Sequence, residues 1–273
     1  KFNIKMNFKF FTSICMVTIQ MTFGQNNANE QEQKKKIQDA IIEEFATNGA
    51  QKYDYNYQMA EWQNSLDNGL KKDSTIAYLW QQKAMPYFKA KKYDVGMPLV
   101  DKAVLYDEKR WLDYRAFIKC IFAKTYKDAI VDFENCNKKF GNQYVQDHTY
   151  AFYIGISYLQ LNEFEKAETI FKTDIEDQSK RFGDGHYLDL FYFGISKYEQ
   201  QKWEDAIVEF DKSLKQYPEF SDVEFYKAIC LARLGKKEES SLLIAKAKKD
   251  AAAGYTINED NAIYETYPYK VRF

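Results

Sequence analysis

The 273-residue sequence is poor in the residues that mark a turn-rich fold, with 4 prolines and 11 glycines. An all-β protein reverses its chain often and uses these residue types at its turns, so the composition argues against an all-β fold. The chain also has no excess of charge of either sign, because it contains 39 Lys and Arg and 40 Asp and Glu. A nucleic-acid-binding protein carries a basic excess that neutralises phosphates. We therefore expect no nucleic-acid partner.

Cysteine is scarce, with four residues in the chain. Cys15 lies in an apolar N-terminal run, which leaves Cys120, Cys136 and Cys230 without a close pair. A disulfide framework or a zinc site needs paired Cys or Cys/His spacing. We expect these three residues to be small, buried core side chains.

Motifs of catalysis are missing as well. The sequence has no G-x-S-x-G elbow, phosphate-binding glycine loop or dinucleotide fingerprint. Its two histidines, His148 and His186, lie in predicted turns and outside any metal-ligand pattern such as His-Glu-x-x-His. We expect no catalytic residue, no metal and no cofactor; an enzyme with its site in the turns or the tail is the alternative.

The N-terminus differs in kind from the rest of the chain. A basic start is followed by a short apolar run to Phe23 and by the small residue Gly24, which resembles a secretory signal peptide. Polar residues such as Thr12 and Gln20 interrupt the run, so a lasting membrane span is not expected. We predict a signal peptide at residues 1–24, with a buried N-terminal helix as the alternative, and a flexible polar leader at 25–36. The protein is then secreted across the inner membrane and is periplasmic or envelope-associated.

Helical periodicity begins after the leader. Ile37, Ile41 and Phe45 are spaced for one face of an amphipathic helix that stops at Asn48-Gly49. A second helix is expected from about residue 55 to 71, with Met59, Trp62, Leu66 and Leu70 on one face.

Aromatic residues are abundant, with 22 Tyr and 21 Phe, and they recur in phase. Four times an aromatic residue is followed by two mostly charged residues, a small residue and, four positions further, a large apolar residue. The copies are Tyr93-Asp94-Val95-Gly96 with Val100, Tyr126-Lys127-Asp128-Ala129 with Phe133, Phe164-Glu165-Lys166-Ala167 with Phe171, and Trp203-Glu204-Asp205-Ala206 with Phe210. Such self-similarity indicates stacked supersecondary units.

These residues resemble the tetratricopeptide repeat family, whose unit is a pair of antiparallel helices of roughly 34 residues. The third copy is the clearest, with Gly155 and Tyr158 on its first helix and Phe164, Ala167 and Phe171 on its second. The resemblance implies an all-α, right-handed solenoid of five to six hairpins over residues 37–250. Small residues would let helix backbones approach while large ones fill the gaps.

Two departures from the pattern carry predictions of their own. Pro86 and Pro98 fall where repeat helices should continue, so we expect a bend or local unwinding there. The repeat spacing lengthens at residues 138–148 and 173–187, which predicts longer second helices and longer turns.

The resemblance also implies a partner-binding groove lined by the first helices. The positions that face it are mostly aromatic and apolar, which favours an extended peptide, an amphipathic helix or a protein surface. Internal packing or self-association of the same side chains is the alternative. The predicted partner-binding residues are Tyr78, Met85, Phe88, Tyr114, Ile118, Phe152, Ile156, Phe191, Ile195 and Phe225.

The periodicity stops before an aromatic and acidic tail at residues 251–273. This tail is expected either to cap the last hairpin or to dock another protein. We expect a non-enzymatic protein–protein interaction scaffold or accessory subunit of a bacterial cell-envelope assembly. A periplasmic peptide- or client-binding chaperone is the alternative. The implied partner is a protein or peptide, with no small-molecule cofactor and no membrane span once the signal peptide is removed.

Overall fold

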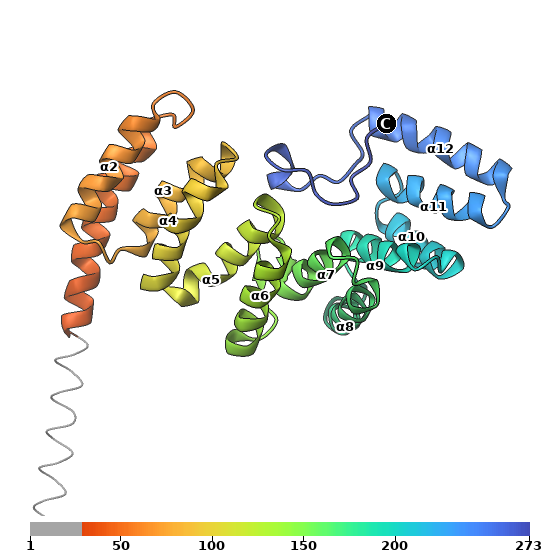
Figure 1. The fold of residues 1–273 in the computed structure, drawn as a ribbon, viewed down its shortest axis with the longest axis horizontal. Coiled ribbons are helices and arrows are strands. Elements are labelled where there is room, and N and C mark those ends of the chain that lie inside the picture. Colours follow the sequence, from red (N-terminus) through yellow and green to blue (C-terminus); the bar gives the residue numbers. More distant parts are fainter. Residues whose placement is uncertain (1–28) are drawn as a thin grey trace, which may run out of the picture. The chain divides into compact units, whose positions relative to one another are not determined.

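The computed structural model describes residues 29–273, and the expected signal peptide lies outside them (Figure 1). In the described part of the chain, α-helices dominate and the only strands are β1 (Tyr144–Val145) and β2 (His148–Thr149). The all-α class predicted from the sequence is confirmed. The chain divides into two compact units, Lys1–Pro86 and Tyr87–Phe273.

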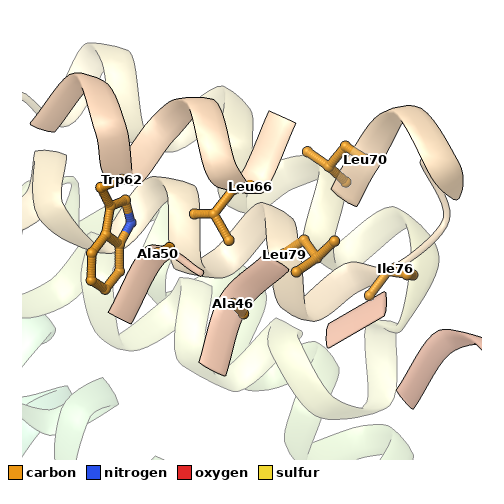
Figure 2. Close-up of a cluster of buried hydrophobic side chains, with 7 residues drawn as sticks. All are labelled: Ala46, Ala50, Trp62, Leu66, Leu70, Ile76 and Leu79. Carbon is orange, nitrogen blue, oxygen red and sulfur yellow. The ribbon is translucent and has the colours of Figure 1, made fainter. Parts of the chain in front are cut away.

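The first unit is built on helix α2 (Met59–Lys72). Residues 29–42 are helical and continue into a π-helical turn, η1 (Glu43–Thr47), followed by the 3₁₀ turn η2 (Ala50–Lys52). The helix thus already includes residues 29–36, where a flexible leader was expected. The predicted apolar face of α2 is confirmed. Its core cluster, shown in Figure 2, comprises Trp62, Leu66 and Leu70 with Ala46, Ala50, Ile76 and Leu79.

The two prolines for which local unwinding was expected, Pro86 and Pro98, lie inside continuous helices, so that expectation is wrong. Pro86 belongs to α3 (Ala77–Lys89) and Pro98 to α4 (Tyr93–Tyr106). A proline has no N–H to donate to the carbonyl four residues before it. For Pro86 that carbonyl is Gln82, which instead accepts the indole N–H of Trp62 at 3.1 Å. The tryptophan therefore satisfies the acceptor that the proline leaves open.

The second unit is a series of helical pairs in which each helix contacts the next along the chain. This nearest-neighbour pattern is that of a helical repeat array. After α4 it contains α5 (Glu108–Phe117) with the π-helical turn η3 (Ile118–Phe122), α6 (Tyr126–Phe140), α7 (Tyr150–Gln160), α8 (Phe164–Phe182), α9 (Tyr187–Glu199), α10 (Trp203–Gln216), α11 (Ser221–Arg233) and α12 (Lys237–Ala252).

Small residues hold the pairs at close approach, as the repeat predicts. A Cβ placed on Gly155 of α7 would lie 2.5 Å from the ring of Phe171 on α8. The same distance separates a Cβ on Gly194 of α9 from Phe210 on α10. Both phenylalanines are fully buried. Glycine at these positions is therefore a packing requirement.

The turns inside the pairs share a backbone conformation that the sequence did not reveal. Two residues before each second helix, φ is positive, at Lys91, Lys124, Asn162, Gln201 and Gly235. In four of these turns the next residue donates its N–H to a carbonyl five residues back, as Lys202 does to Lys197 at 3.0 Å, whereas after η3 Thr125 donates to Lys119, six residues back. This is the Schellman motif that ends a helix with a left-handed residue. The repeat is thus set by backbone geometry as well as by side-chain packing.

The lengthened spacings have different outcomes. At residues 173–187 the second helix is longer, because α8 has 19 residues. At residues 138–148 the prediction of a longer helix is wrong, since α6 ends at Phe140. The extra residues form an antiparallel ladder in which Val145 pairs with His148. This ladder places His148 directly before α7.

Cys120, Cys136 and Cys230 are free and buried, as expected. Burial raises the pKa of the Cys120 thiol to about 12. Within residues 29–273, no helix combines the length and apolar character needed to cross a membrane.

The Gly155–Phe171 contact predicts the sign of a substitution. Gly155→Ala should destabilise the protein by about 1–3 kcal/mol, because the new methyl group forces the Phe171 ring to move. Helix propensity alone would favour alanine by about 1 kcal/mol. Chemical denaturation measures the difference.

The control is a double-mutant cycle with Phe171→Leu, which opens space for the methyl group. The two substitutions together should cost less than their sum, by about 0.5–3 kcal/mol. A stabilising Gly155→Ala would contradict the close approach.

Candidate functional site

The most distinctive surface feature is the segment after α12, residues 253–273, which we call the tail. It leaves the end of α12, passes through the 3₁₀ turn η4 (Asp260–Ile263) and returns to the α11–α12 pair, as the dark blue loop of Figure 1 shows. The tail lies against the last helical pair, where a cap was one of the two expectations. The tail also contacts α4, the turns before α4 and α6, β2 and α9 within the second unit.

Asp222 fixes both limbs of the tail. This carboxylate lies in the first turn of α11 and is fully buried. Its Oδ2 accepts the backbone N–H of Ile257 at 2.9 Å, and its Oδ1 accepts that of Val271 at 2.6 Å. Thr256 adds a hydroxyl bond of 2.6 Å to Oδ2. One buried charge is thus satisfied mainly by backbone donors of the tail.

Glu265 holds the far end of the loop. Its carboxylate accepts a hydrogen bond from the hydroxyl of Tyr93, at the start of α4. Lys91 lies 3.3 Å and Lys124 3.2 Å from its oxygens. These two lysines occupy left-handed turn positions of successive pairs. The shared turn geometry therefore brings together the cations that bind Glu265.

Aromatic contacts hold the returning limb. The hydroxyl of Tyr192 on α9 donates to the carbonyl of Pro268 at 2.9 Å. Tyr269 packs on Tyr226 of α11 with ring centroids 6.0 Å apart, and Tyr267 is 1% exposed. The tail is thus bound by hydrogen bonds and by buried apolar area.

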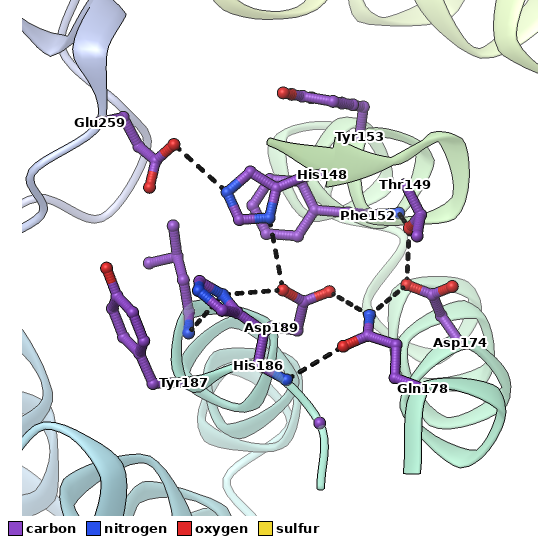
Figure 3. Close-up of polar contacts among 12 residues, drawn as sticks. His148, Thr149, Phe152, Tyr153, Asp174, Gln178, His186, Tyr187, Asp189 and Glu259 are labelled. Atoms are coloured by element: carbon purple, nitrogen blue, oxygen red, sulfur yellow. Dashed lines mark hydrogen bonds and ion pairs between the residues drawn. The ribbon is translucent and has the colours of Figure 1, made fainter. Parts of the chain in front are cut away.

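A polar cluster lies where the tail crosses the start of α7 (Figure 3). His148 is buried, and its Nε2 lies 3.2 Å from Oε2 of Glu259 in the tail. Its Nδ1 lies 3.4 Å from Oδ2 of Asp189, in the first turn of α9. His186, the N-cap residue of α9, also has its Nδ1 3.4 Å from the same oxygen. The two histidines of the chain therefore converge on one carboxylate.

The charges of this cluster support one another. Burial would lower the pKa of His148, but Asp189 and Glu259 outweigh burial and raise it to about 9. Burial would likewise raise the pKa of Asp189, yet the two imidazoles hold it at about 2. His148 and Asp189 thus each favour the charged form of the other in the buried site.

The structure places most of the predicted groove residues in the interior. Phe88, Ile118, Phe152, Ile156, Phe191 and Ile195 are each at most 2% exposed. Tyr78 and Met85 pack against the core of the first unit, and Tyr114 stacks edge-on against Trp111. Phe225 contacts the tail, with its ring edge-on to that of Phe273. The six buried side chains therefore do not line an open groove, as the family resemblance had implied. They pack between helices instead.

The residues that do contact the tail were not predicted. Asp222 and Tyr192 carried no sequence motif, and the two histidines were interpreted as separate turn residues. One usable signal existed: both histidines occur in the lengthened turns between repeats. No one-dimensional spacing rule joins positions so far apart.

Residues 190–219, which cover most of α9 and all of α10, match the tetratricopeptide repeat family model. The fold is similar to a tetratricopeptide repeat protein from Parabacteroides merdae, with a TM-score of 0.62 and 14% identity over 78% of this chain and 79% of that one. It is also similar to PilW, a type IV pilus biogenesis factor, with a TM-score of 0.59 and 16% identity over 74% and 90%. A third similar structure is YrrB, a tetratricopeptide repeat protein with an unusual peptide-binding site. Its TM-score is 0.50, with 15% identity over 68% of this chain and 92% of that one.

Residues 190–219 thus match one tetratricopeptide repeat, and the fold of the chain is that of tetratricopeptide repeat proteins. No protein of curated function matches the sequence.

The Glu265 contacts predict a pH-dependent contribution to stability. Burial would raise the pKa of Glu265, but the bonds from Tyr93 and Lys124 hold it below the ordinary value of 4.5. A carboxyl with a depressed folded-state pKa stabilises the fold above its unfolded-state pKa and loses that effect as the pH falls. Glu265→Gln should therefore cost about 1–3 kcal/mol at pH 7. The cost should shrink as the pH falls below about 4.5.

Asp260→Asn provides the matched control, since Asp260 is an exposed carboxylate in the same tail. Denaturant unfolding at pH 7 and at pH 4 gives the comparison. An equal cost for Glu265→Gln at both pH values would contradict the ion-pair account.

Proposed function

We propose that this protein is a non-enzymatic interaction scaffold that binds an extended segment of a partner protein along the face its own tail covers. The tail itself carries the proposal. A looped stretch of polypeptide already lies against α4, β2, α9 and α11, held by hydrogen bonds and buried side chains.

Several contacts on this face are made to the main chain of the tail, so they do not depend on the amino-acid sequence of the bound segment. Asp222 accepts two backbone N–H groups, and Tyr192 donates to a backbone carbonyl. The N–H of Ser221 donates to the carbonyl of Tyr255 at 3.0 Å. Main-chain contacts of this kind provide affinity for extended peptides, while side-chain pockets provide specificity.

The side-chain pockets define the chemistry of the partner. Lys91, Lys124 and Tyr93 surround a carboxylate, and the residue two positions further, Tyr267, is buried. The favoured partner segment is extended and acidic, with an aromatic residue two positions after the acid. A tethered tail has an effective concentration in the millimolar range for short flexible linkers, so it also competes with the partner.

The location that we propose is the bacterial cell envelope, with the scaffold as an accessory subunit of an assembly there. The signal-peptide pattern of residues 1–24 supports export. PilW, one of the proteins with a similar fold, is a pilus biogenesis factor. The fold supports many functions, so the sequence pattern carries more weight in this part of the proposal.

A native exchange experiment tests the binding face. A protease site inserted after Ala253, in the exposed turn at Gly254, allows the tail to be cut after the protein has folded. A labelled peptide of residues 255–273 should then replace the cut tail with a Kd in the micromolar range, which corresponds to about −8 kcal/mol. Fluorescence anisotropy measures the exchange.

The controls separate the scaffold from the chaperone alternative. Uncut protein should bind the labelled peptide at least about tenfold more weakly than cut protein does. A peptide carrying Glu265→Lys should bind the cut protein more weakly by the same factor, a difference of about 1.4 kcal/mol. Equal binding of a scrambled peptide would favour a chaperone that accepts unfolded segments. Absence of exchange in cut, folded protein would contradict the binding face.

A further inference from the structure

Three donor atoms converge beneath the tail in a way that hydrogen bonding does not explain. They are Nδ1 of His148, Nδ1 of His186 and Oδ2 of Asp189, all within 4.8 Å of one another. Figure 3 shows the two rings directed at the same carboxylate oxygen. Asp189 is 1% exposed, and its Oδ2 accepts no hydrogen bond in the structure.

The distances fit metal ligands better than an ion pair. Each imidazole Nδ1 lies 3.4 Å from Oδ2. A charge-assisted N–H···O bond is normally about 2.7–2.9 Å long. Zinc binds His nitrogen and Asp oxygen at about 2.0–2.2 Å, and a tetrahedral angle then separates two ligand atoms by about 3.4 Å. The two separations from Oδ2 to the imidazole nitrogens match that tetrahedral edge, and the two nitrogens lie within 4.8 Å of each other.

We propose that His148, His186 and Asp189 form a Zn²⁺ site, against the sequence-based expectation of no metal. Two imidazoles and a carboxylate are a donor set suited to zinc. Three protein ligands leave a fourth position for water or another small ligand.

The hydrogen-bond partners of the proposed ligands are arranged as in known metal sites. Metal-binding histidines usually donate their second ring nitrogen to a carboxylate, and Nε2 of His148 lies 3.2 Å from Glu259. The second oxygen of Asp189, Oδ1, accepts a hydrogen bond from Gln178 at 2.8 Å. Gln178 also accepts the backbone N–H of His186 at 3.0 Å. Phe152 stacks on the His148 ring with centroids 3.8 Å apart, which fixes the ring plane.

The open side of the site provides room for the fourth ligand. An open pocket of about 340 Å³ adjoins the cluster, and its lining includes both histidines and the carboxylates Asp147 and Asp184. His186 is half exposed to it, with 46% of its side chain accessible. Its Nδ1 also accepts the N–H of Leu188, at 3.4 Å, a long bond that zinc would replace.

Such a site would couple metal binding to the tail. Glu259 is a tail residue, so a zinc ion on Nδ1 of His148 strengthens the contact between Nε2 of His148 and the tail. This coupling depends on the observed Glu259 contact and not on the function proposed above.

Metal titration of the full-length, tag-free chain tests the proposal. After chelator treatment, calorimetry with Zn²⁺ should show one site with a Kd of about 1 μM or tighter. Co²⁺ in its place should give the strong visible absorption of a tetrahedral ion. His186→Ala, which removes a half-exposed ligand, should weaken zinc binding at least tenfold. Glu259→Gln, which removes the carboxylate that contacts Nε2 of His148, should weaken zinc binding by about 10–100-fold.

Asp184→Asn is the matched control, because it removes a negative charge from the same pocket without removing a ligand. Its zinc affinity should stay within about twofold of the wild type, and circular dichroism of each metal-free variant confirms folding. Absence of saturable binding, or equal affinity of wild type and folded His186→Ala, would overturn the zinc site. The second result would point to binding at cysteine or at scattered carboxylates.

Discussion

The contact of a helix backbone with a phenyl ring, at Gly155 with Phe171 and again at Gly194 with Phe210, sets the geometry of the second unit. Because the ring of one helix rests directly on the glycine backbone of the other, each of these two pairs packs at a fixed distance and phase. The left-handed turn residues then start each second helix in the same way. Together these constraints place β2, α9, the start of α11 and the turns before α4 and α6 where the one looped tail contacts them. The face that binds the tail is therefore a product of the repeat.

The charges on this face are placed where the repeat makes them accessible. Asp222 lies in the first turn of α11, where the helix dipole favours a carboxylate, and it accepts two backbone N–H groups of the tail. Lys91 and Lys124, at equivalent turns of successive pairs, bind Glu265. The buried carboxylates of Asp222 and Glu265 are costly unless their hydrogen-bond and ion-pair partners are in place, so they favour one position of the tail over others.

The fold could be predicted from the sequence because the repeated small and large residues report packing directly. Gly155, Ala167, Gly194 and Ala206 are all in the interior, as the phase of the pattern requires. The turn geometry could not be predicted, because four of its five left-handed residues are Lys, Asn or Gln, and glycine is the residue that signals such a turn. Pro86 was misjudged because the compensating donor, Trp62, belongs to another helix.

The site was harder to predict than the fold. Family positions such as Phe152 and Phe191 were assigned to a groove, yet they pack against neighbouring aromatic rings in the interior. His148 and His186 meet only because the β1–β2 ladder and the N-cap of α9 bring two distant turns together. The tail could be recognised as aromatic and acidic, but its path depends on pockets assembled from several repeats.

The central claim is that the tail is a bound segment with Asp222 as its anchor. Hydrogen exchange of the Ile257 and Val271 amides in the native protein tests it most directly, because both amides donate to that one carboxylate. The account predicts slow exchange of both amides, and a joint acceleration in Asp222→Asn while the amides of α9 and α10 stay protected. Exchange of both amides at the rate of an unfolded peptide in the wild-type protein would contradict the account.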